Sequence, residues 1–349
     1  MGLGTDHVTI TTADKFIPEL WSDETIALYK QKLVLANLIT NISFKGKKGD
    51  TLHIPVPARG DASIKAAGSQ VTLVTDTATA KDIVVNKHYE YSYLFEDLAA
   101  MQSLNSMRNF YTDAAAYGLA RRIDRELHKL GIAFQGGAAA AAATYYEKGF
   151  IGGDGTTLFS GGANTNTGNG SALTDSAIRR SIQRLEDSDI DNSEIKFVIP
   201  PVEGNVLRGI AKFTEQAFVG NGSVIKTGML GSLYGMEIFT STNCPFVHVN
   251  SVTGTQSVNF SGTGLGQAGA SYADDFATAV DWNSTSPTDT QYRPCLMLHK
   301  DAMVLATQQS IRTQSQYKQE YLGTLVTSDC VFGTLELRDY AALCLLVPA

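Results

Sequence analysis

The sequence predicts a mixed α+β protein of elongated shape, and three observations carry this prediction. A proline-free segment at 97–131 has helical periodicity over a length unusual for a globular helix. Two segments, 51–56 and 83–93, alternate apolar and polar residues as strands do, and they flank a stretch of small residues at 61–80. Three further strand-like segments, 295–309, 324–338 and 340–348, close the chain.

The composition of the chain is that of a folded protein with few charges. It has 349 residues, 43% hydrophobic and 18% charged, with a net charge of −7. Residues 1–135 carry 15 basic and 15 acidic residues, whereas the rest carry 13 and 20, so the acid excess lies past residue 135. An acidic chain is a poor candidate for coating free nucleic acid.

The cysteines and the N-terminal sequence point to a cytoplasmic protein. Cys244, Cys295, Cys330 and Cys344 lack zinc or redox spacing, and we expect four reduced, buried thiols. The first residues show no basic segment followed by an apolar run, and no apolar stretch of about 18 residues occurs. We therefore expect no signal peptide, no membrane span, no cofactor and no metal.

The N-terminal third predicts a helix followed by a long ribbon. A helix is expected from about Ser22, with an apolar stripe through Ile26, Tyr29 and Leu33. The strand at 51–56 contains Pro55, which cannot donate to a ladder, so it lies at an edge. Together with the strand at 83–93 it predicts a long two-stranded arm whose tip, 61–80, lacks bulky apolar residues. Such an arm has little core of its own and is expected to lie on another copy of the chain.

The segment 97–131 predicts one very long helix. Its apolar stripe continues through Leu119, Ile123, Leu127 and Leu130, with Asp97 as N-cap and Gly131 as C-cap. At 1.5 Å per residue the helix is about 50 Å long.

The remaining segments predict a second α/β region. The stretch 135–170 is a loop of small residues, and a helix within 173–190 begins at Thr174 or Asp175. A buried strand follows at 194–201, a short helix at 201–210, a strand at 235–240 and a polar loop at 250–290.

Four patterns with possible chemistry are better explained structurally. Gly264–Gly269 matches a dinucleotide-binding glycine pattern, but its flanks are loop-like. His299-Lys300-Asp301 predicts a turn between strands, and no histidines have metal-ligand spacing. Arg59-Gly60-Asp61 predicts a turn of the ribbon rather than an adhesion site. The basic group of the long helix either faces phosphates or, the interpretation we favour, forms a solvated face paired with Asp124 and Glu126; its members are Arg121, Arg122, Arg125 and Lys129.

The order of these elements resembles the major capsid (coat) proteins of tailed bacteriophages, which have the HK97-like fold. The matching segments are 48–99 as an extended loop, 119–130 as the end of a spine helix, 176–209 and 228–245 in an axial domain, and 298–309 and 332–347 as closing strands. The similarity is one of layout; no short motif is diagnostic.

The resemblance implies an α+β capsid fold with an N-terminal arm, an extended β-ribbon (E-loop), a spine helix in a peripheral (P-) domain and an α/β axial (A-) domain. The implied boundaries are 1–40 for the arm and short helix, 41–95 for the ribbon, 96–174 with 308–349 for the peripheral domain, and 175–307 for the axial domain. The implied function is structural and not enzymatic: self-assembly into the pentamers and hexamers of an icosahedral shell, in the virion, assembled in the bacterial cytoplasm.

The resemblance also implies partners and contact residues. The shell would enclose double-stranded DNA without specific binding, and a separate scaffolding protein, a portal and a decoration or cement protein are the other expected partners. Intersubunit contacts are expected at Arg59, Asp61, Lys65, Gln70 and Lys81. The expected inward, DNA-facing residues are Arg108, Arg121, Arg122, Arg125 and Lys129.

Two other classes of function stay open at this point. One is a soluble cytoplasmic enzyme of the hydrolase type, although the sequence has neither a Gly-x-Ser-x-Gly elbow nor a phosphate-binding loop. The other is an adhesion module built on Arg59-Gly60-Asp61. The size of the purified protein separates the three, because a shell protein forms capsomers or particles.

Overall fold

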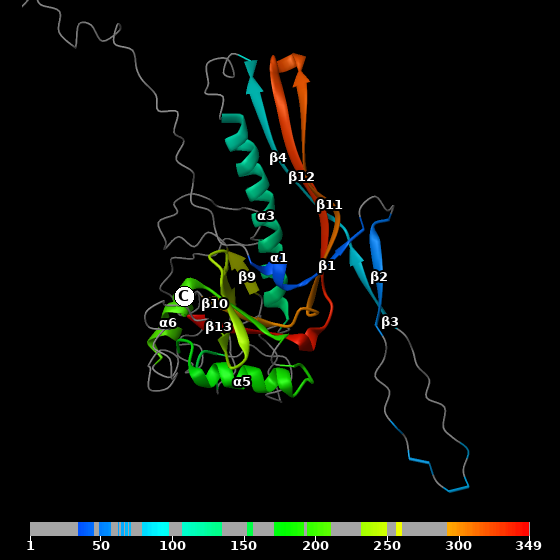
Figure 1. Cartoon of the computed structure of the whole chain (residues 1–349), viewed down its shortest axis with the longest axis vertical. Helices are drawn as coiled ribbons and strands as arrows, with labels where there is room; N and C mark the ends of the chain where they lie inside the picture. The colour runs from blue at the N-terminus through cyan, green and yellow to red at the C-terminus, as the bar shows by residue number, and fades with distance from the viewer. Residues whose placement is uncertain are drawn as a thin grey trace, which may run out of the picture.

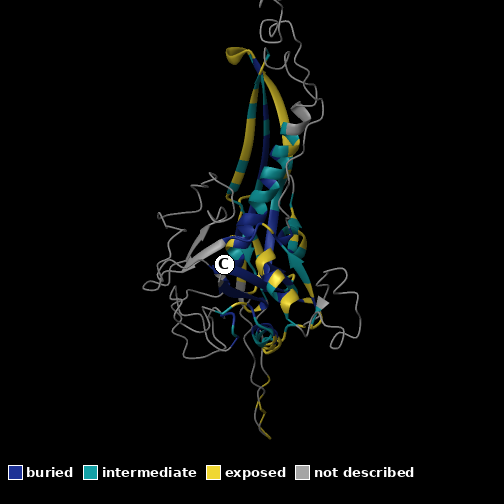
Figure 2. Cartoon of the chain, turned by 90° about the vertical axis from the view of Figure 1, so that its left-hand side faces the viewer, coloured by how far each residue is buried: buried dark blue, intermediate teal, exposed yellow. Residues whose placement is uncertain are grey.

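The computed structural model shows an elongated molecule in which one long helix lies against a sheet that extends away from an α/β base (Figure 1). It describes residues 34–44, 49–56, 62, 64–65, 67–68, 70, 79–97, 107–134, 152–155, 171–191, 194–210, 232–249, 256–259 and 292–348. Buried residues concentrate in the base, and the far end of the sheet is exposed (Figure 2).

A four-stranded sheet has the order β1-β11-β12-β4. Its strands are β1 (Thr40–Ser43), β11 (Met303–Lys318), β12 (Gly323–Glu336) and β4 (Lys87–Glu96). The pairing of β1 with β11 is parallel and the other pairings are antiparallel. A hairpin joins β11 to β12 through the 3-10 turn η4 (Gln319–Tyr321). We call the outer part of β4, β11 and β12, together with the helix beside it, the arm. This arm is distinct from the ribbon and from the expected N-terminal arm at 1–40.

A seven-stranded sheet forms the base of the molecule. Its order is β6-β7-β5-β10-β8-β9, with β13 also paired to β10. The fully buried β10 is its central strand, because it pairs with β13, β5 and β8. The bounds are Lys196–Ile199 (β5), Ser232–Leu233 (β6), Met236–Thr240 (β7), Phe246–Val249 (β8), Gln256–Asn259 (β9), Tyr292–Leu298 (β10) and Ala342–Pro348 (β13).

Helix α5 (Asp175–Glu186) packs an apolar stripe against this sheet. Ile178, Ile182 and Leu185 lie in one buried cluster with Phe197 of β5. Thr174, rather than Asp175, is the cap, because its hydroxyl accepts a hydrogen bond from the Ala177 amide at 3.3 Å. The 3-10 turn η5 (Asp339–Ala341) precedes β13.

Several predicted elements are confirmed, and one is wrong in part. The strand at 194–201 is β5, and the helix at 201–210 is α6 (Pro201–Gly209), with proline in its first turn. The three closing segments form β10 to β13. The predicted loop at 250–290 contains β9, which pairs antiparallel with β8. A four-residue polar strand at a sheet edge gives little apolar signal, which is why the sequence pattern missed it.

The predicted long helix is α3 (Met107–Ala133), and it spans about 40 Å. Leu119 and Leu127 of its stripe are buried in the main core cluster. Gly131 does not end the helix, contrary to the C-cap prediction. A Cβ atom at Gly131 would lie 2.8 Å from Leu296 Cδ1, so this glycine provides space for β10. The proposed N-cap Asp97 precedes 98–106, which lie outside the described residues.

The predicted ribbon is correct near its root and wrong beyond Val84. Strand β2 (Thr51–Val56) pairs antiparallel with β3 (Thr79–Val84). The expected single strand at 83–93 is divided, because β4 begins at Lys87 and pairs with β12 instead. Ile83 is fully buried against Val304 and Ala306, which anchors the ribbon on the sheet before the chain turns into β4.

The N-terminal helix predicted from Ser22 lies outside the described residues, as do Gly264–Gly269 and Arg59-Gly60-Asp61. The first described helix is the short α1 (Leu35–Leu38), and its buried Leu35 belongs to the same core cluster as Leu127 of α3. None of the helices within the described ranges is both long and apolar enough for a membrane span.

Candidate intersubunit surfaces

Aromatic side chains of β4 join the arm sheet to α3. Tyr93 and Phe95 pack on Tyr111 of α3, with ring centroids 4.8 and 5.5 Å apart. Tyr91 lies over Gly118, where an added Cβ atom would be 3.4 Å from the Tyr91 ring. Alternate β4 residues therefore face the helix, and the residues between them face the opposite side of the sheet.

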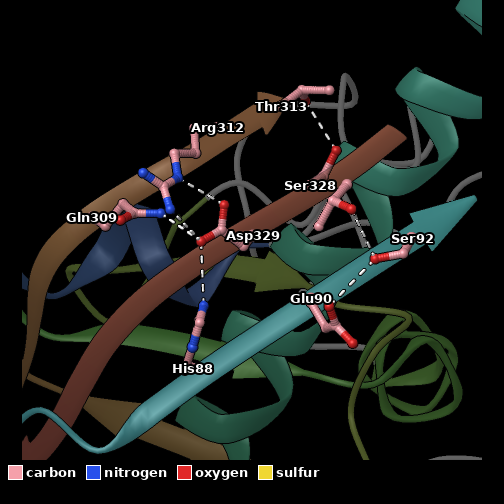
Figure 3. Close-up of polar contacts among 9 residues, drawn as sticks. His88, Glu90, Ser92, Gln309, Arg312, Thr313, Ser328 and Asp329 are labelled. Carbon is pink, nitrogen blue, oxygen red and sulfur yellow. Dashed lines mark hydrogen bonds and ion pairs between the residues drawn. The ribbon is translucent and has the colours of Figure 1, made fainter. Parts of the chain in front are cut away.

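Asp329 of β12 ties together the three strands of the arm on that opposite side (Figure 3). It accepts hydrogen bonds from Arg312 Nε and Nη2 at 2.8 and 3.1 Å, from Gln309 at 2.7 Å and from His88 at 3.2 Å. These hydrogen bonds, those of Arg312 first, lower the pKa of Asp329 to about 2. The arm sheet is therefore cross-linked by one ionised carboxylate.

A second ionic cluster joins the inner end of β4 to α3. Glu126 accepts hydrogen bonds from Lys87 and from the Tyr89 hydroxyl, and it pairs with Arg122 at 3.3 Å. The Arg122 guanidinium also lies 4.8 Å from the centre of the Tyr89 ring. The pKa of Glu126 is lowered, because its hydrogen bond to Lys87 and the nearby cations outweigh the opposing effect of burial.

A buried polar junction connects α3 to α1 and to the turn after β7. Asp124 accepts from the Leu35 amide at 3.0 Å and from Asn243 Nδ2 at 2.8 Å. His128 is fully buried one turn later, with Nε2 3.6 Å from Asp124 Oδ2 and 3.4 Å from Ser241 Oγ. Burial lowers the pKa of His128, and the charge of Asp124 opposes this only in part.

The residues expected at intersubunit contacts are placed only in part. Lys65, Gln70 and Lys81 are exposed, and Lys81 Nζ lies 3.5 Å from the Glu336 carbonyl oxygen. Arg59 and Asp61 lie outside the described residues. On the ribbon root, His53 pairs with Asp82 across the two strands at 2.5 Å.

The basic group of α3 does not form the solvated face that the sequence favoured. Asp124, Arg125 and Glu126 are buried, and Arg125 donates to Asn243 at 3.2 Å. Arg121 and Arg122 are half-buried, whereas Lys129 is exposed. The helix contacts the arm sheet through β4, β11 and β12 and the base through β10 and β13, and Arg122, Arg125 and Glu126 make internal contacts. The side chain of Arg108 lies outside the described residues.

A cavity of about 210 Å³ opens between β4 and α3. Its aromatic wall is Tyr89 and Tyr91 of β4, with Glu90 between them in the chain, and three arginines of α3 line the other side. The arginines are Arg121, Arg122 and Arg125.

The turn at 299–301 and the four cysteines, which the sequence singled out, are among the described residues. His299-Lys300-Asp301 forms the expected turn between β10 and β11, and Asp301 accepts a hydrogen bond from the Thr40 hydroxyl at 2.9 Å. All four cysteines are reduced and buried, as predicted. Among the described residues, no cluster of histidine, cysteine and acidic side chains could hold a metal ion.

No family model matches the sequence, and the comparison with curated proteins gives no match. Solved structures do match. The structure from Mycobacterium phage Che8 is similar with a TM-score of 0.62 and 19% identity, over 95% of this chain and 97% of that one. The capsid structure of cyanophage P-SCSP1u has a TM-score of 0.68 and 14% identity, over 99% and 97%. The capsid of Ralstonia phage GP4 has a TM-score of 0.63 and 14% identity, over 99% and 98%.

The chain has the fold of bacteriophage capsid proteins.

The similarity to capsid proteins covers nearly the whole chain, so both the arm and the seven-stranded base belong to the shared fold. The resemblance that the sequence suggested is thereby confirmed at the level of the fold.

The sequence patterns missed two features of this structure. Asp329 and Arg312 carry no motif, and they meet only because β11 and β12 pair in one register. The arginine-lined cavity needs β4 beside α3, and the sequence instead suggested that β4 belongs to the ribbon. A signal was available for the cavity, because Tyr89, Tyr91 and Tyr93 alternate on one face of β4.

Proposed function

We propose that the chain is a major capsid protein with the HK97-like fold, which self-assembles into pentamers and hexamers of an icosahedral shell. The observation that carries the proposal is the similarity to phage capsid structures over 99% of the chain. The described residues between 62 and 70 also support it, because they are exposed, whereas the ribbon root is anchored by the buried Ile83. In this role the protein is a structural component of the virion and not an enzyme.

The proposed domains follow the two sheets and the long helix of the fold. Residues 1–40 are proposed to form the N-terminal arm and 41–84 the ribbon that lies on a neighbouring subunit through Lys65, Gln70 and Lys81, while β4 belongs to the four-stranded sheet. The peripheral domain is proposed to comprise α3 with the four-stranded sheet, and the axial domain the seven-stranded base, to which β13 belongs although it lies within 308–349. Assembly takes place in the bacterial cytoplasm with a scaffolding protein and a portal, and a decoration protein is a further proposed partner.

The shell is proposed to enclose double-stranded DNA without binding it tightly or specifically. The chain has a net charge of −7, and Arg122 and Arg125 of the proposed inward face are already held by Glu126 and Asn243. Isolated subunits should therefore bind DNA only nonspecifically, with a Kd of about 10⁻⁴ M or weaker at physiological salt. A gel-shift titration at about 150 mM salt tests this point.

Sedimentation velocity of nuclease-treated protein tests the proposed function. Capsomer-sized and larger species should form without nucleic acid, if needed after addition of a scaffolding protein from the same source. A small oligomer of fixed size under all conditions would support an enzyme instead.

A further inference from the structure

The outer end of the arm exposes apolar side chains. Tyr321 and Leu322 at the β11–β12 hairpin are 63% and 65% exposed. Leu322 adopts a left-handed backbone conformation with φ of 43°, which is uncommon for a residue other than glycine. The Leu322 carbonyl accepts a hydrogen bond from the Asp97 amide at 2.9 Å, which holds the strained turn in place. Exposed apolar groups held in a strained turn indicate a contact surface. We call Glu320, Tyr321 and Leu322 the tip.

The cavity between β4 and α3 has chemistry complementary to the tip. Its lining carries three arginines of α3 beside the rings of Tyr89 and Tyr91, whereas the Glu90 side chain faces the opposite side of the sheet, where it accepts from Ser92. Arg122 pairs with Glu126 and Arg125 donates to Asn243, so internal contacts fix the positions of these two arginines. Arg121 is half-buried on the same wall, with its guanidinium 5.8 Å from the Tyr117 ring centre. Such a site suits a carboxylate flanked by apolar side chains.

The tip and the cavity of one chain cannot meet. Both lie along β4, where Gly323 next to the tip pairs with Glu96, and Tyr91 lines the cavity. Five residues of extended strand separate Tyr91 from Glu96, which is about 17 Å. The helix-backed sheet keeps the two apart, so only a second copy can bring a tip to this cavity.

We propose that the tip of one copy docks in the arginine-lined cavity of a second copy, with Glu320 paired to Arg121 and with Tyr321 and Leu322 against the tyrosine wall. The contact is head-to-tail, because two different surfaces of the same chain meet, and such contacts close into rings when the rotation between copies allows it. This inference rests on the proposed function and names a contact by which copies join.

Site-directed cross-linking tests the contact directly. The native cysteines are buried, and burial raises the pKa of Cys244 to about 12, so they compete little with an introduced surface thiol. Chains with Leu322→Cys are mixed with chains carrying Tyr91→Cys and are oxidised mildly, both at high protein concentration and under assembly conditions. The matched control partner is Leu94→Cys, which is on the same strand with similar exposure but alternates to the opposite face.

The Leu322→Cys and Tyr91→Cys mixture should give at least tenfold more disulfide-linked dimer than the control mixture. Equal yields, or no dimer in either condition, would overturn the docking proposal. Sedimentation of the wild type is measured in parallel and reports separately on the proposed function. If shells form without this cross-link, the docking proposal alone is wrong.

Charge exchange tests the assigned ion pair. Arg121→Glu and Glu320→Arg should each lower the assembled fraction at least tenfold, and the two changes in one chain should restore most of it. Lys129→Glu on α3 and Glu96→Arg near the tip are exposed controls outside the pair, and each should assemble like the wild type. Failure of the combined variant to recover, while both single variants keep the wild-type melting temperature, would refute the pairing of Glu320 with Arg121.

Discussion

Gly333 of β12 lies directly against the Val84 carbonyl, where the ribbon root crosses the arm sheet. A Cβ atom at Gly333 would be 2.6 Å from the Val84 oxygen and 3.2 Å from its carbonyl carbon. The obstacle is backbone, so no side-chain rotation could relieve it. This close approach places Ile83 in its buried site and lets the chain turn from β3 into β4.

Gly333→Ala is therefore expected to lower the free energy of unfolding by about 2 kcal/mol, because the ribbon root must move off the sheet. Denaturant unfolding measures the change. Gly209→Ala, at the end of α6 with no atom near the added methyl group, should change stability by less than about 0.5 kcal/mol. Equal effects of the two substitutions would show that the ribbon root is not packed on β12.

The Asp329 cluster predicts an acid-sensitive arm. Asp329→Asn removes a charge that Arg312 and His88 both contact, and it should cost about 1–2 kcal/mol at pH 7. The folded pKa of about 2 lies below the ordinary value of 3.8, so this stabilisation is present above about pH 4 and is lost as the pH falls toward 2. Unfolding of both proteins between pH 2 and 7 measures the difference.

Glu90→Gln is the matched control for Asp329, since Glu90 lies opposite it on β4 and is exposed. This control should change the stability at pH 7 by less than about 0.5 kcal/mol. A stability difference between wild type and Asp329→Asn that persists unchanged at pH 2 would contradict the proposed cause.

The buried His128 is expected to cause a second pH dependence of the stability, at milder acidity. Burial lowers its pKa in the folded state below 6.5, so the unfolded chain binds a proton that the folded chain does not. Stability is therefore full above about pH 6.5 and falls as the pH drops below it, by up to about 1.4 kcal/mol per pH unit. In His128→Gln this slope should be smaller, whereas His53→Gln on the exposed ribbon should retain it. Parallel stability curves for wild type and His128→Gln between pH 5 and 7.5 would argue against a buried neutral histidine.

The ribbon is predicted to serve assembly rather than folding. Replacing residues 61–76 by a short Asn-Gly turn leaves β2, β3 and the buried Ile83 intact, so the melting temperature should stay within a few degrees of the wild type. Assembly should fail, because the removed residues are those proposed to lie on a neighbour. Sedimentation and circular dichroism measure the two properties. If this variant forms normal particles, the ribbon does not make a required contact between subunits.

Local patterns in the sequence predicted the elements, but not the pairings between distant segments. The Thr174 cap and the α5 stripe are visible in twelve residues, and the alternation of β4 is visible in ten. The partner of β4 is β12, more than 200 residues later, and nothing within residues 83–93 distinguishes a ribbon strand from an arm strand. Gly131 shows the same limit, since a glycine late in a helix suggests a cap, whereas the tertiary contact with Leu296 explains it here.

The candidate contact surfaces were harder to predict than the fold, because they depend on which side chains the fold leaves exposed. Arg121, Arg122 and Arg125 are a visible group in the sequence, and a solvated face was a reasonable interpretation of alternating charges. That interpretation is wrong for Arg125 and its neighbours Asp124 and Glu126, because these three residues are buried. The exposed tip had no sequence signal, since Tyr321 and Leu322 are apolar residues between two strands.

Electron microscopy of the purified, nuclease-treated protein is the most direct test of shell formation. The proposed capsid function predicts closed shells of uniform diameter, or rings of five and six subunits that close into shells when a scaffolding protein is added, with an absorbance spectrum free of nucleic acid. Compact oligomers of fixed small size that never form rings or shells, or particles that appear only when nucleic acid is present, would contradict it.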